Sequence, residues 1–342
     1  MVHFWQIILL PSFLLNIVKA VPSPLPSNLA IHTIYEFPNE TWIENIAVSS
    51  NGNLLLNLLS TPQLYQLQAL NPVPGSAKLL YTFPYATGLT GIAEIQPDVF
   101  AVLAGNWSIG TFSTTPGSWS VWKVDFRRGR KNDPAVSKIT DLTKASFANG
   151  MTLLTPGSPY LLIADSVLGV VWRLDYLTSE YEIILESPLM LPPPGPIVLG
   201  INGIHVFDSS VYFTNSFQGL FARVPVELYG PDAGSATGDY VVVANNGPGD
   251  DFAFDKEGNA YITQDPSDAL ELVTRKGMVT VLAGNVNSTI LEGDTAASFG
   301  RTKWDENVLY VVTNGGIAGA VKGTQITGGK VLAVDVKALL SS

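Results

Sequence analysis

The chain has 342 residues, with 19 lysines and arginines against 29 aspartates and glutamates, and it contains no cysteine. The missing thiols exclude disulfide scaffolds, zinc fingers, iron–sulfur clusters and cysteine nucleophiles. The formal charge of −10 argues against nucleic acid as a partner, because phosphates require a basic surface. Hydrophobic residues make up 46% of the chain, which excludes disorder, and its 31 glycines and 23 prolines predict many turns.

Residues 1–20 carry the features of a secretory signal peptide. An interrupted apolar run ends at Val18-Lys19-Ala20, and a proline-rich lead over residues 21–29 follows. A membrane anchor is the competing interpretation, but the run is too short and too interrupted to cross about 30 Å of hydrocarbon. We therefore expect no membrane anchor and a protein that is secreted or held in the lumen of the secretory pathway. Sequons predict glycosylation at Asn39, Asn106 and Asn287.

Residues 30–342 repeat one pattern six times. Each repeat begins with a short apolar strand, and further short β-branched and aromatic strands follow, bounded by Gly, Pro, Asn and Asp. Four strands in a unit of about 50 residues are typical of a propeller blade. The sequence therefore predicts one all-β domain, a six-bladed β-propeller; a β-sandwich is the rival fold, but it gives no reason for six equivalent units. The first residues of the repeats, called openers below, are Glu44, Thr90, Asn149, Asn202, Asp250 and Thr295.

The last repeat lacks its fourth strand at the C-terminal end of the chain. The N-terminal segment Ile34-Tyr35-Glu36-Phe37-Pro38 closely resembles Leu80-Tyr81-Thr82-Phe83-Pro84, the fourth strand of the first repeat. We therefore expect the N-terminal strand to complete the last blade and close the ring by hydrogen bonds, without disulfides.

The openers are expected at one rim of the central channel. Glu44, Asn149, Asn202 and Asp250 would bring carboxylate and amide oxygens together there, which are ligands suited to Ca²⁺ or Mg²⁺. Each of them taken alone is also an ordinary turn residue. Histidine-based catalytic templates are not supported, because His32 and His205 are out of place and are predicted to be packing or surface residues.

Other residues near this rim are candidates for ligand binding. Aromatic walls and a few donors make a typical small-molecule site, although packing between blades is an alternative role for each aromatic ring. Strand alternation places two apolar residues deeper on the same side, Met151 and Phe252. The candidate donors are Thr90, Asn149, Ser166, Asn202 and Asn215, the candidate walls are Trp42, Tyr85, Trp107 and Phe217, and Asn314 completes the rim.

The openers resemble those of the senescence-marker protein/gluconolactonase family of six-bladed propellers. The matching residues are Glu44, Asn149-Gly150, Asn202-Gly203 and Asp250. The resemblance implies a divalent cation on these four positions and a role for Asp250 as general base in lactone hydrolysis. The chain departs from the family at Asn45-Ile46, where Gly-Pro is usual, and at Asp251, where the family has glycine.

A fungal secreted branch of this family is more similar still. This resemblance rests on the sequence segments Gly88-Leu89-Thr90-Gly91-Ile92-Ala93-Glu94, Ile163-Ala164-Asp165-Ser166, Leu199-Gly200-Ile201-Asn202-Gly203 and Phe299-Gly300-Arg301-Thr302. Some members resemble hetero-Diels–Alderases that join a tropolone-derived quinone methide to a sesquiterpene such as humulene. This implies small apolar substrates, no redox cofactor, and a monomer or weak dimer. A metal-dependent lactonase and a non-catalytic binding propeller are the alternatives.

Overall fold

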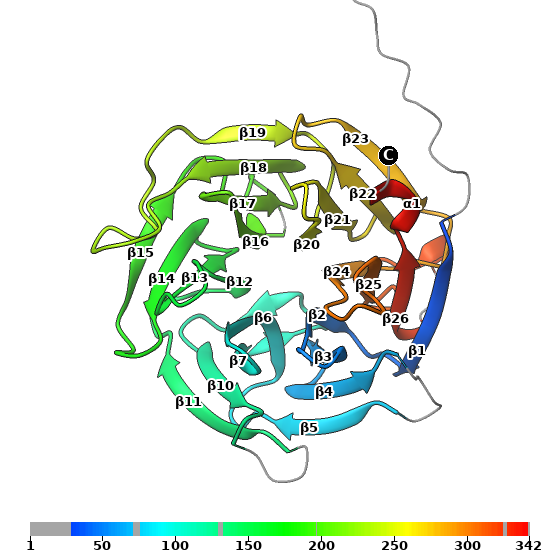
Figure 1. Ribbon diagram of the computed structural model, residues 1–342, viewed down its shortest axis with the longest axis horizontal. Helices are drawn as coiled ribbons and strands as arrows, with labels where there is room; N and C mark the ends of the chain where they lie inside the picture. The colour runs from blue at the N-terminus through cyan, green and yellow to red at the C-terminus, as the bar shows by residue number, and fades with distance from the viewer. Residues whose placement is uncertain (1–28, 71–75, 129–132, 196, 324–326, 341–342) are drawn as a thin grey trace, which may run out of the picture.

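The computed structural model describes residues 29–342 except 71–75, 129–132, 196, 324–326 and 341–342. The predicted signal peptide and residues 21–28 of the lead lie outside this part and remain predictions. In the described part, six four-stranded antiparallel sheets surround a central channel like the blades of a propeller, as Figure 1 shows. The predicted six-bladed β-propeller is confirmed. No helix within the described residues is long and apolar enough to span a bilayer.

Each blade runs outward from a strand beside the channel, called its inner strand. Blade 1 holds β2 (Ile43–Val48), β3 (Asn53–Leu58), β4 (Gln63–Gln68) and β5 (Lys78–Thr82), and blade 2 holds β6 (Gly88–Gln96), β7 (Val99–Gly105), β10 (Ser120–Asp125) and β11 (Ala135–Asp141). Blade 3 holds β12 (Ala148–Leu153), β13 (Tyr160–Asp165), β14 (Val170–Asp175) and β15 (Tyr181–Glu186), and blade 4 holds β16 (Ile201–Phe207), β17 (Ser210–Asn215), β18 (Leu220–Pro225) and β19 (Val241–Ala244). Blade 5 holds β20 (Phe252–Phe254), β21 (Ala260–Gln264), β22 (Ala269–Val273) and β23 (Val279–Gly284), and blade 6 holds β24 (Asp294–Phe299), β25 (Val308–Thr313), β26 (Gly328–Asp335) and β1 (Ile31–Asn39).

Three short elements lie outside this scheme. The hairpin of β8 (Trp107–Ser108) and β9 (Ser113–Thr114) is inserted in blade 2, after β7. A 3-10 turn, η1 (Val321–Gly323), precedes β26, and α1 (Lys337–Leu340) follows it. The hairpin explains why the second repeat is longer than the others, and it is the element that shapes the site described below.

The ring closes in the predicted way, because β1 is the outer strand of blade 6. It pairs antiparallel with β26, from Ile31 opposite Val334 to Asn39 opposite Gly328. Gly328 is required at this junction, since a Cβ atom there would lie 1.6 Å from the carbonyl oxygen of Phe37. The chain ends are thus joined by strand pairing, and Figure 1 shows blue β1 beside red β26.

A circle of hydrogen bonds between neighbouring blades reinforces this closure. Buried Thr and Asn side chains on the two innermost strands donate across each blade boundary, mainly to backbone carbonyls. Such bonds satisfy polar groups that are shielded from water. The six links are Asn57 to Thr90 (2.6 Å), Thr90 to Ala148 (2.8 Å), Asn149 to Asn202 (2.7 Å), Thr214 to Asp250 (2.5 Å), Thr263 to Thr295 (2.9 Å) and Thr295 to Ile43 (2.6 Å).

Most inner strands carry a β-bulge near their opener. The register shifts between Ala148 and Met151 in β12 and between Ile201 and Ile204 in β16, and similar shifts occur in β2, β6 and β24. A bulge adds a residue to one strand and redirects the side chains after it. Residues that follow the opener therefore do not face the end of the channel that simple alternation predicts.

Candidate active site

A cavity of about 450 Å³ lies at the end of the channel where the inner strands begin, and we call it the upper cavity. This volume is within the range of sites that enclose small molecules. Seven of the residues that the sequence singled out line it: Trp42, Glu44, Trp107, Asn149, Asn202, Phe217 and Asp250.

One wall of the upper cavity is aromatic. Phe112, at the tip of the β8–β9 hairpin, lies 6.2 Å from Trp42 and 6.3 Å from Trp107 between ring centroids. Trp107 stacks on Phe147 with centroids 4.9 Å apart and the planes 12° from parallel. Four rings from three segments thus form one aromatic wall, which suits an apolar ligand.

The hairpin is held in place by hydrogen bonds to its surroundings. Thr87 Oγ1 donates to the carbonyl oxygen of Trp107 (2.7 Å) and accepts from the Trp107 backbone N–H (2.8 Å). Thr114 Oγ1 donates to the Ser146 carbonyl oxygen at 2.9 Å. The indole Nε1 of Trp107 is buried and has no partner within the described residues. The wall is therefore fixed at its base, and it carries one donor that the fold does not use.

The floor of the cavity is a relay of amides. Asn149 Nδ2 donates to Asn202 Oδ1 at 2.7 Å, Asn202 Nδ2 donates to Ser216 Oγ at 3.0 Å, and Ser216 Oγ donates to the Gly249 carbonyl oxygen at 2.8 Å. A Cβ on Gly150 would lie 2.3 Å from the Asn202 carbonyl oxygen. The glycine after the opener is therefore needed because the inner strands approach so closely, and the Asn-Gly pairs are not turns.

Three acids face the same cavity: Glu44 and Asp250 are buried, and Asp265 is partly buried. Burial raises the pKa of Glu44 to about 8, while the hydrogen bond from Trp42 lowers it and the nearby acids Asp265 and Asp251 raise it. Burial raises the pKa of Asp265 to about 7. Burial, followed by the charge of Glu44, also holds the pKa of Asp250 well above its usual range. Near neutral pH this site favours protonated carboxylic acids, which are hydrogen-bond donors.

The four family positions also fit a divalent cation in chemical type. Glu44 Oε2 and Asn202 Oδ1 accept hydrogen bonds from Trp42 and Asn149. Glu44 Oε1, Asn149 Oδ1 and both carboxylate oxygens of Asp250 accept no hydrogen bond from any described residue. These are hard oxygen donors of the kind that Ca²⁺ and Mg²⁺ bind. Among the described residues, no group of three or more acidic or histidine side chains is placed to hold a metal, so any cation here depends on the amides.

Several residues expected at the rim lie elsewhere. Tyr85 is 93% exposed and does not line the cavity. Thr90 is fully buried, and its hydroxyl donates to the Ala148 carbonyl oxygen and so links blades 2 and 3. Asn215 Nδ2 donates to the carbonyl oxygens of Leu189 and Leu191 and so fixes a loop. The predicted donors Thr90 and Asn215 are thus structural, and the predicted wall Tyr85 is on the outer surface.

Ser166 and Asn314 are also absent from the cavity lining. Ser166 is fully buried, with no partner for its hydroxyl among the described residues. Asn314 Nδ2 donates to Asp265 Oδ2 at 2.9 Å, and its Oδ1 accepts from the N–H groups of Gly316 and Ile317. Asn314 therefore positions an acid of the site and does not itself face a ligand.

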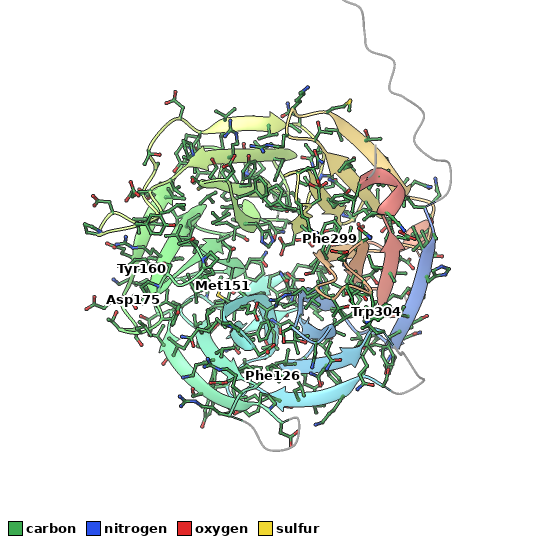
Figure 2. The ribbon with its side chains drawn as sticks, viewed as in Figure 1. Phe126, Met151, Tyr160, Asp175, Phe299 and Trp304 are labelled. Atoms are coloured by element: carbon green, nitrogen blue, oxygen red, sulfur yellow. The ribbon has the colours of Figure 1, made fainter. Side chains whose placement is uncertain are left out.

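Met151 and Phe252 line a different cavity, at the opposite end of the channel. Met151 is redirected by the bulge in β12, and Phe252 begins the short β20 directly after Asp250 and Asp251, which both pair with Thr263. Figure 2 shows Met151 beside the channel. Their predicted place in the openers' cavity is wrong, because regular alternation does not hold at the start of these strands.

Sequence reasoning missed two aromatic residues of the upper cavity, Phe112 and Phe147, which complete the aromatic wall. The 59-residue spacing between Thr90 and Asn149, the longest of the five, is a signal for the inserted hairpin that carries Phe112. Asp265, the third acid, directly follows the second strand of blade 5, which is where the repeat pattern places the rim.

Comparison with known proteins agrees with this arrangement. No family model matches the chain. It is 29% identical over 328 residues to "Putative hetero-Diels-Alderase asR5" of Sarocladium schorii, covering 86% of this chain and 79% of that protein. It is 28% identical over 318 residues to a "Putative hetero-Diels-Alderase" of a Phoma species, covering 85% and 87% of the two chains. The chain resembles fungal hetero-Diels–Alderases.

Solved structures share the fold at low sequence identity. A luciferin-regenerating enzyme has a TM-score of 0.61 at 12% identity and covers 90% of this chain and 95% of its own. Regucalcin, a calcium-binding protein of Agrobacterium tumefaciens, has a TM-score of 0.59 at 15% identity, with coverages of 90% and 95%. A gluconolactonase of Xanthomonas campestris has a TM-score of 0.57 at 11% identity, with coverages of 91% and 90%. The expected similarity to propellers of the gluconolactonase type is confirmed for the fold.

Proposed function

We propose that this protein is a hetero-Diels–Alderase and that its reaction takes place in the upper cavity. The observation that carries the proposal is the similarity, over 85–86% of the chain, to two proteins named for this activity. The site chemistry supports it, since apolar walls surround a small group of neutral donors. The substrates we propose are a tropolone-type quinone methide as diene and a humulene-like sesquiterpene as the alkene partner.

In this reaction the carbonyl oxygen and the exocyclic methylene carbon of the quinone methide bond to the two carbons of one alkene. No atom is lost and no electron is transferred, so neither a redox cofactor nor a covalent nucleophile is required. The barrier falls when both partners are held in a near-attack arrangement. The stacked pair Trp107 and Phe147, with Phe112 beside it, offers a flat face for the conjugated ring, while Phe217, which is 46% exposed, lies at the entrance.

The acids supply the electrostatic part of the proposed catalysis. A donor to the carbonyl oxygen draws electron density from the diene and stabilises charge that develops in the transition state. Glu44 is suited to this role because Trp42 occupies only its Oε2, which leaves Oε1 to carry the proton. Asp250 is a second donor of the same kind, and the Asn149–Asn202 relay fixes the floor between them.

A metal-dependent lactonase is the second candidate function. It is favoured by one observation, the presence of Glu44, Asn149, Asn202 and Asp250 around the same cavity. A bound Ca²⁺ or Mg²⁺ would polarise a lactone carbonyl, and Asp250 would then serve as the base. The names of the two fungal relatives favour cycloaddition over this alternative.

The test is to incubate the purified protein with a quinone-methide precursor and humulene. We expect a higher product yield and a single dominant diastereomer compared with buffer alone. Asn202→Ala removes the centre of the amide relay that positions the floor of the cavity, and we expect the rate to fall by up to about 100-fold, the effect of misplacing reacting groups. The proposal is overturned if yield and stereochemistry equal those of the buffer control. Lactone hydrolysis that EDTA abolishes, together with no cycloaddition, would establish the alternative.

A further inference from the structure

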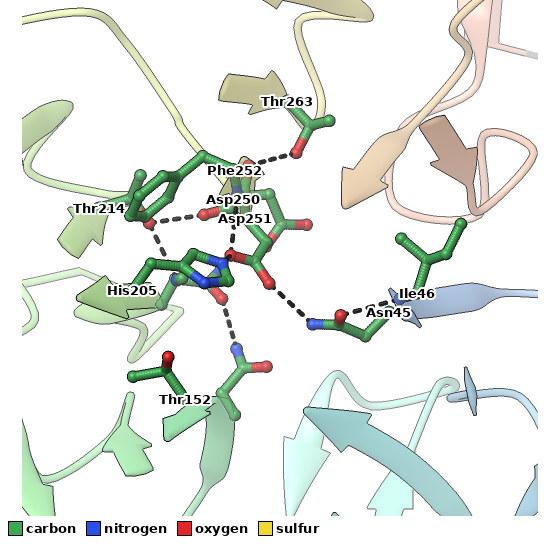
Figure 3. A network of polar contacts seen from close by, with 12 residues as sticks. Asn45, Ile46, Thr152, His205, Thr214, Asp250, Asp251, Phe252 and Thr263 are labelled. Carbon is green, nitrogen blue, oxygen red and sulfur yellow. Dashed lines mark hydrogen bonds and ion pairs between the residues drawn. The ribbon is translucent and has the colours of Figure 1, made fainter. Parts of the chain in front are cut away.

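The opposite end of the channel holds a second cavity of about 440 Å³, which we call the lower cavity. Its lining comes from the later residues of all six inner strands, so it is separated from the upper cavity by the openers. Neither the family resemblance nor the proposed cycloaddition assigns a role to it. Its polar groups form the network drawn in Figure 3.

Asp251 is the centre of this network and is held by three donors. Its Oδ2 accepts from Asn45 Nδ2 at 2.8 Å, and its Oδ1 accepts from the Phe252 backbone N–H at 2.8 Å. Its Oδ1 also lies 2.9 Å from His205 Nε2. Asn45 is itself oriented, because its Oδ1 accepts from the Ile46 backbone N–H. The carboxylate therefore has a fixed position between blades 1, 4 and 5.

This geometry determines which nitrogen of His205 is available. An ionised carboxylate only accepts hydrogen bonds, so Asp251 places the proton of a neutral imidazole on Nε2. Nδ1 then carries the lone pair, and it has no partner among the described residues. The ring also packs edge-to-face on Phe252, with centroids 4.7 Å apart. About one third of the side chain is exposed, and the residue lines the lower cavity.

The rest of the lower cavity is largely apolar or internally paired. Arg301 Nη1 donates to both Glu94 Oε2 and the Val48 carbonyl oxygen, so the charge of Arg301 is paired with that of Glu94. Aromatic and aliphatic side chains of the inner strands supply the walls, among them Phe299, which Figure 2 shows beside the channel. Because Asp251 leaves a net negative charge, a neutral ligand is favoured over a carboxylate or phosphate.

We propose that the lower cavity is a binding site for a neutral aromatic or enolic hydroxyl compound, whose O–H donates to His205 Nδ1 while its ring packs on the apolar walls. The Asp251–His205–Asn45 network supplies the fixed acceptor. This site is distinct from the upper cavity and does not depend on the proposed cycloaddition.

The probe is phenol, which is neutral at neutral pH, with anisole as its matched control, because the methyl ether has the same ring but no O–H. The chain has only three histidines, so spectra of protein carrying ¹³C-labelled histidine are simple to assign. We expect phenol to shift the His205 ring signals and to leave those of His32, which is exposed on β1, unchanged. We expect anisole to bind about 10-fold more weakly, the effect of one lost hydrogen bond.

His205→Phe keeps a ring against Phe252 but removes the acceptor, and it should weaken phenol binding by the same factor of about 10. Phe112→Ala changes only the hairpin at the upper cavity and should leave this binding intact. Equal affinity for the phenol and the ether, or a shift of His32 without one of His205, overturns the proposal. The comparison of the two probes uses the wild-type chain, so it decides the matter even if His205→Phe does not fold.

Discussion

The indole Nε1 of Trp42 donates a hydrogen bond to Glu44 Oε2 at 2.5 Å, which joins the aromatic wall of the upper cavity to its acid. This bond lowers the pKa of Glu44 against the stronger effect of burial, which raises it to about 8. The same contact leaves the other carboxyl oxygen to carry the proton. The Trp42–Glu44 pair therefore sets the pH range in which Glu44 can act as a donor.

Replacing Trp42 with phenylalanine tests this coupling. Trp42→Phe keeps an aromatic wall but removes the hydrogen bond, so the pKa of Glu44 should rise further. If protonated Glu44 polarises the diene, the pH at which the cycloaddition rate declines should move upward from about 8. The measurement is a rate profile from roughly pH 6 to pH 10, the range around that pKa. An unchanged decline would show that Glu44 does not govern the rate.

The stability of the fold should depend on pH through the same residue. Because burial raises the pKa of Glu44 from 4.5 to about 8, the folded protein keeps a proton that the unfolded chain releases over this range. Its contribution to stability is therefore full below pH 4.5 and is lost as the pH rises through about 8. Glu44→Gln cannot ionise, so its melting temperature should fall less between pH 5 and pH 8, about the limits of that window.

Glu36→Gln is the matched control for this melting experiment, because Glu36 is exposed on the outer strand β1. Its melting profile should follow that of the wild type. Parallel profiles for wild type and Glu44→Gln would contradict the assignment of a raised pKa to Glu44.

A cation in the site would favour ionised Glu44, so added Ca²⁺ should raise the melting temperature most at high pH if the four opener positions bind it.

Phe112 should contribute to substrate binding more than to stability. It lies at the tip of the hairpin, is 39% exposed and contacts both Trp42 and Trp107. Phe112→Ala should raise the KM for the aromatic substrate about 10-fold while leaving the melting temperature nearly unchanged, since little buried area is lost. Tyr85→Ala is the control, because this exposed ring lies outside the cavity, and steady-state kinetics of the two variants decide the point. Equal effects of both substitutions would refute a binding role for Phe112.

The circle of hydrogen bonds between blades should be measurable at Thr295. Its Oγ1 donates to the Ile43 carbonyl oxygen at 2.6 Å and so links blade 6 to blade 1. Thr295→Val preserves the volume but leaves this buried carbonyl without its donor, at a cost of about 1–3 kcal/mol in the free energy of unfolding. Thr295→Ser restores a hydroxyl and should recover most of the loss. The free energy of unfolding of both variants is measured by denaturant unfolding. Equal stability of Thr295→Val and Thr295→Ser would argue against a contribution from the hydrogen bond to Ile43.

Much of the architecture was predictable because it repeats. Six openers at similar spacing indicate six blades, and the likeness of residues 34–38 to residues 80–84 indicates the strand that closes the ring. The main opener residues of the site were predictable for the same reason. Glu44, Asn149, Asn202 and Asp250 occupy equivalent positions in successive blades, and equivalent positions around one axis must converge.

Tertiary structure decided what local pattern could not. The bulge in β12 places Met151 at the far cavity, because one extra residue reverses the direction of every side chain that follows. Asp250 and Asp251 both pair with Thr263 just before β20, and Phe252 also lies at the far cavity. The sequence allows Thr90 to be either a donor in the site or a link between blades. The 2.8 Å hydrogen bond from its hydroxyl to the Ala148 carbonyl oxygen shows that it is a link.

The sequence by itself thus determined the fold and the ring of openers, because periodicity and composition can be read directly along the chain. The aromatic wall, the raised pKa values of the acids and the second cavity arise only when blades distant in the chain meet. Asp251 and Asn45 are 206 positions apart, yet they share one hydrogen bond in the centre of the molecule. The burial of Glu44 and the contact that orients His205 are properties of that assembly and not of any single segment.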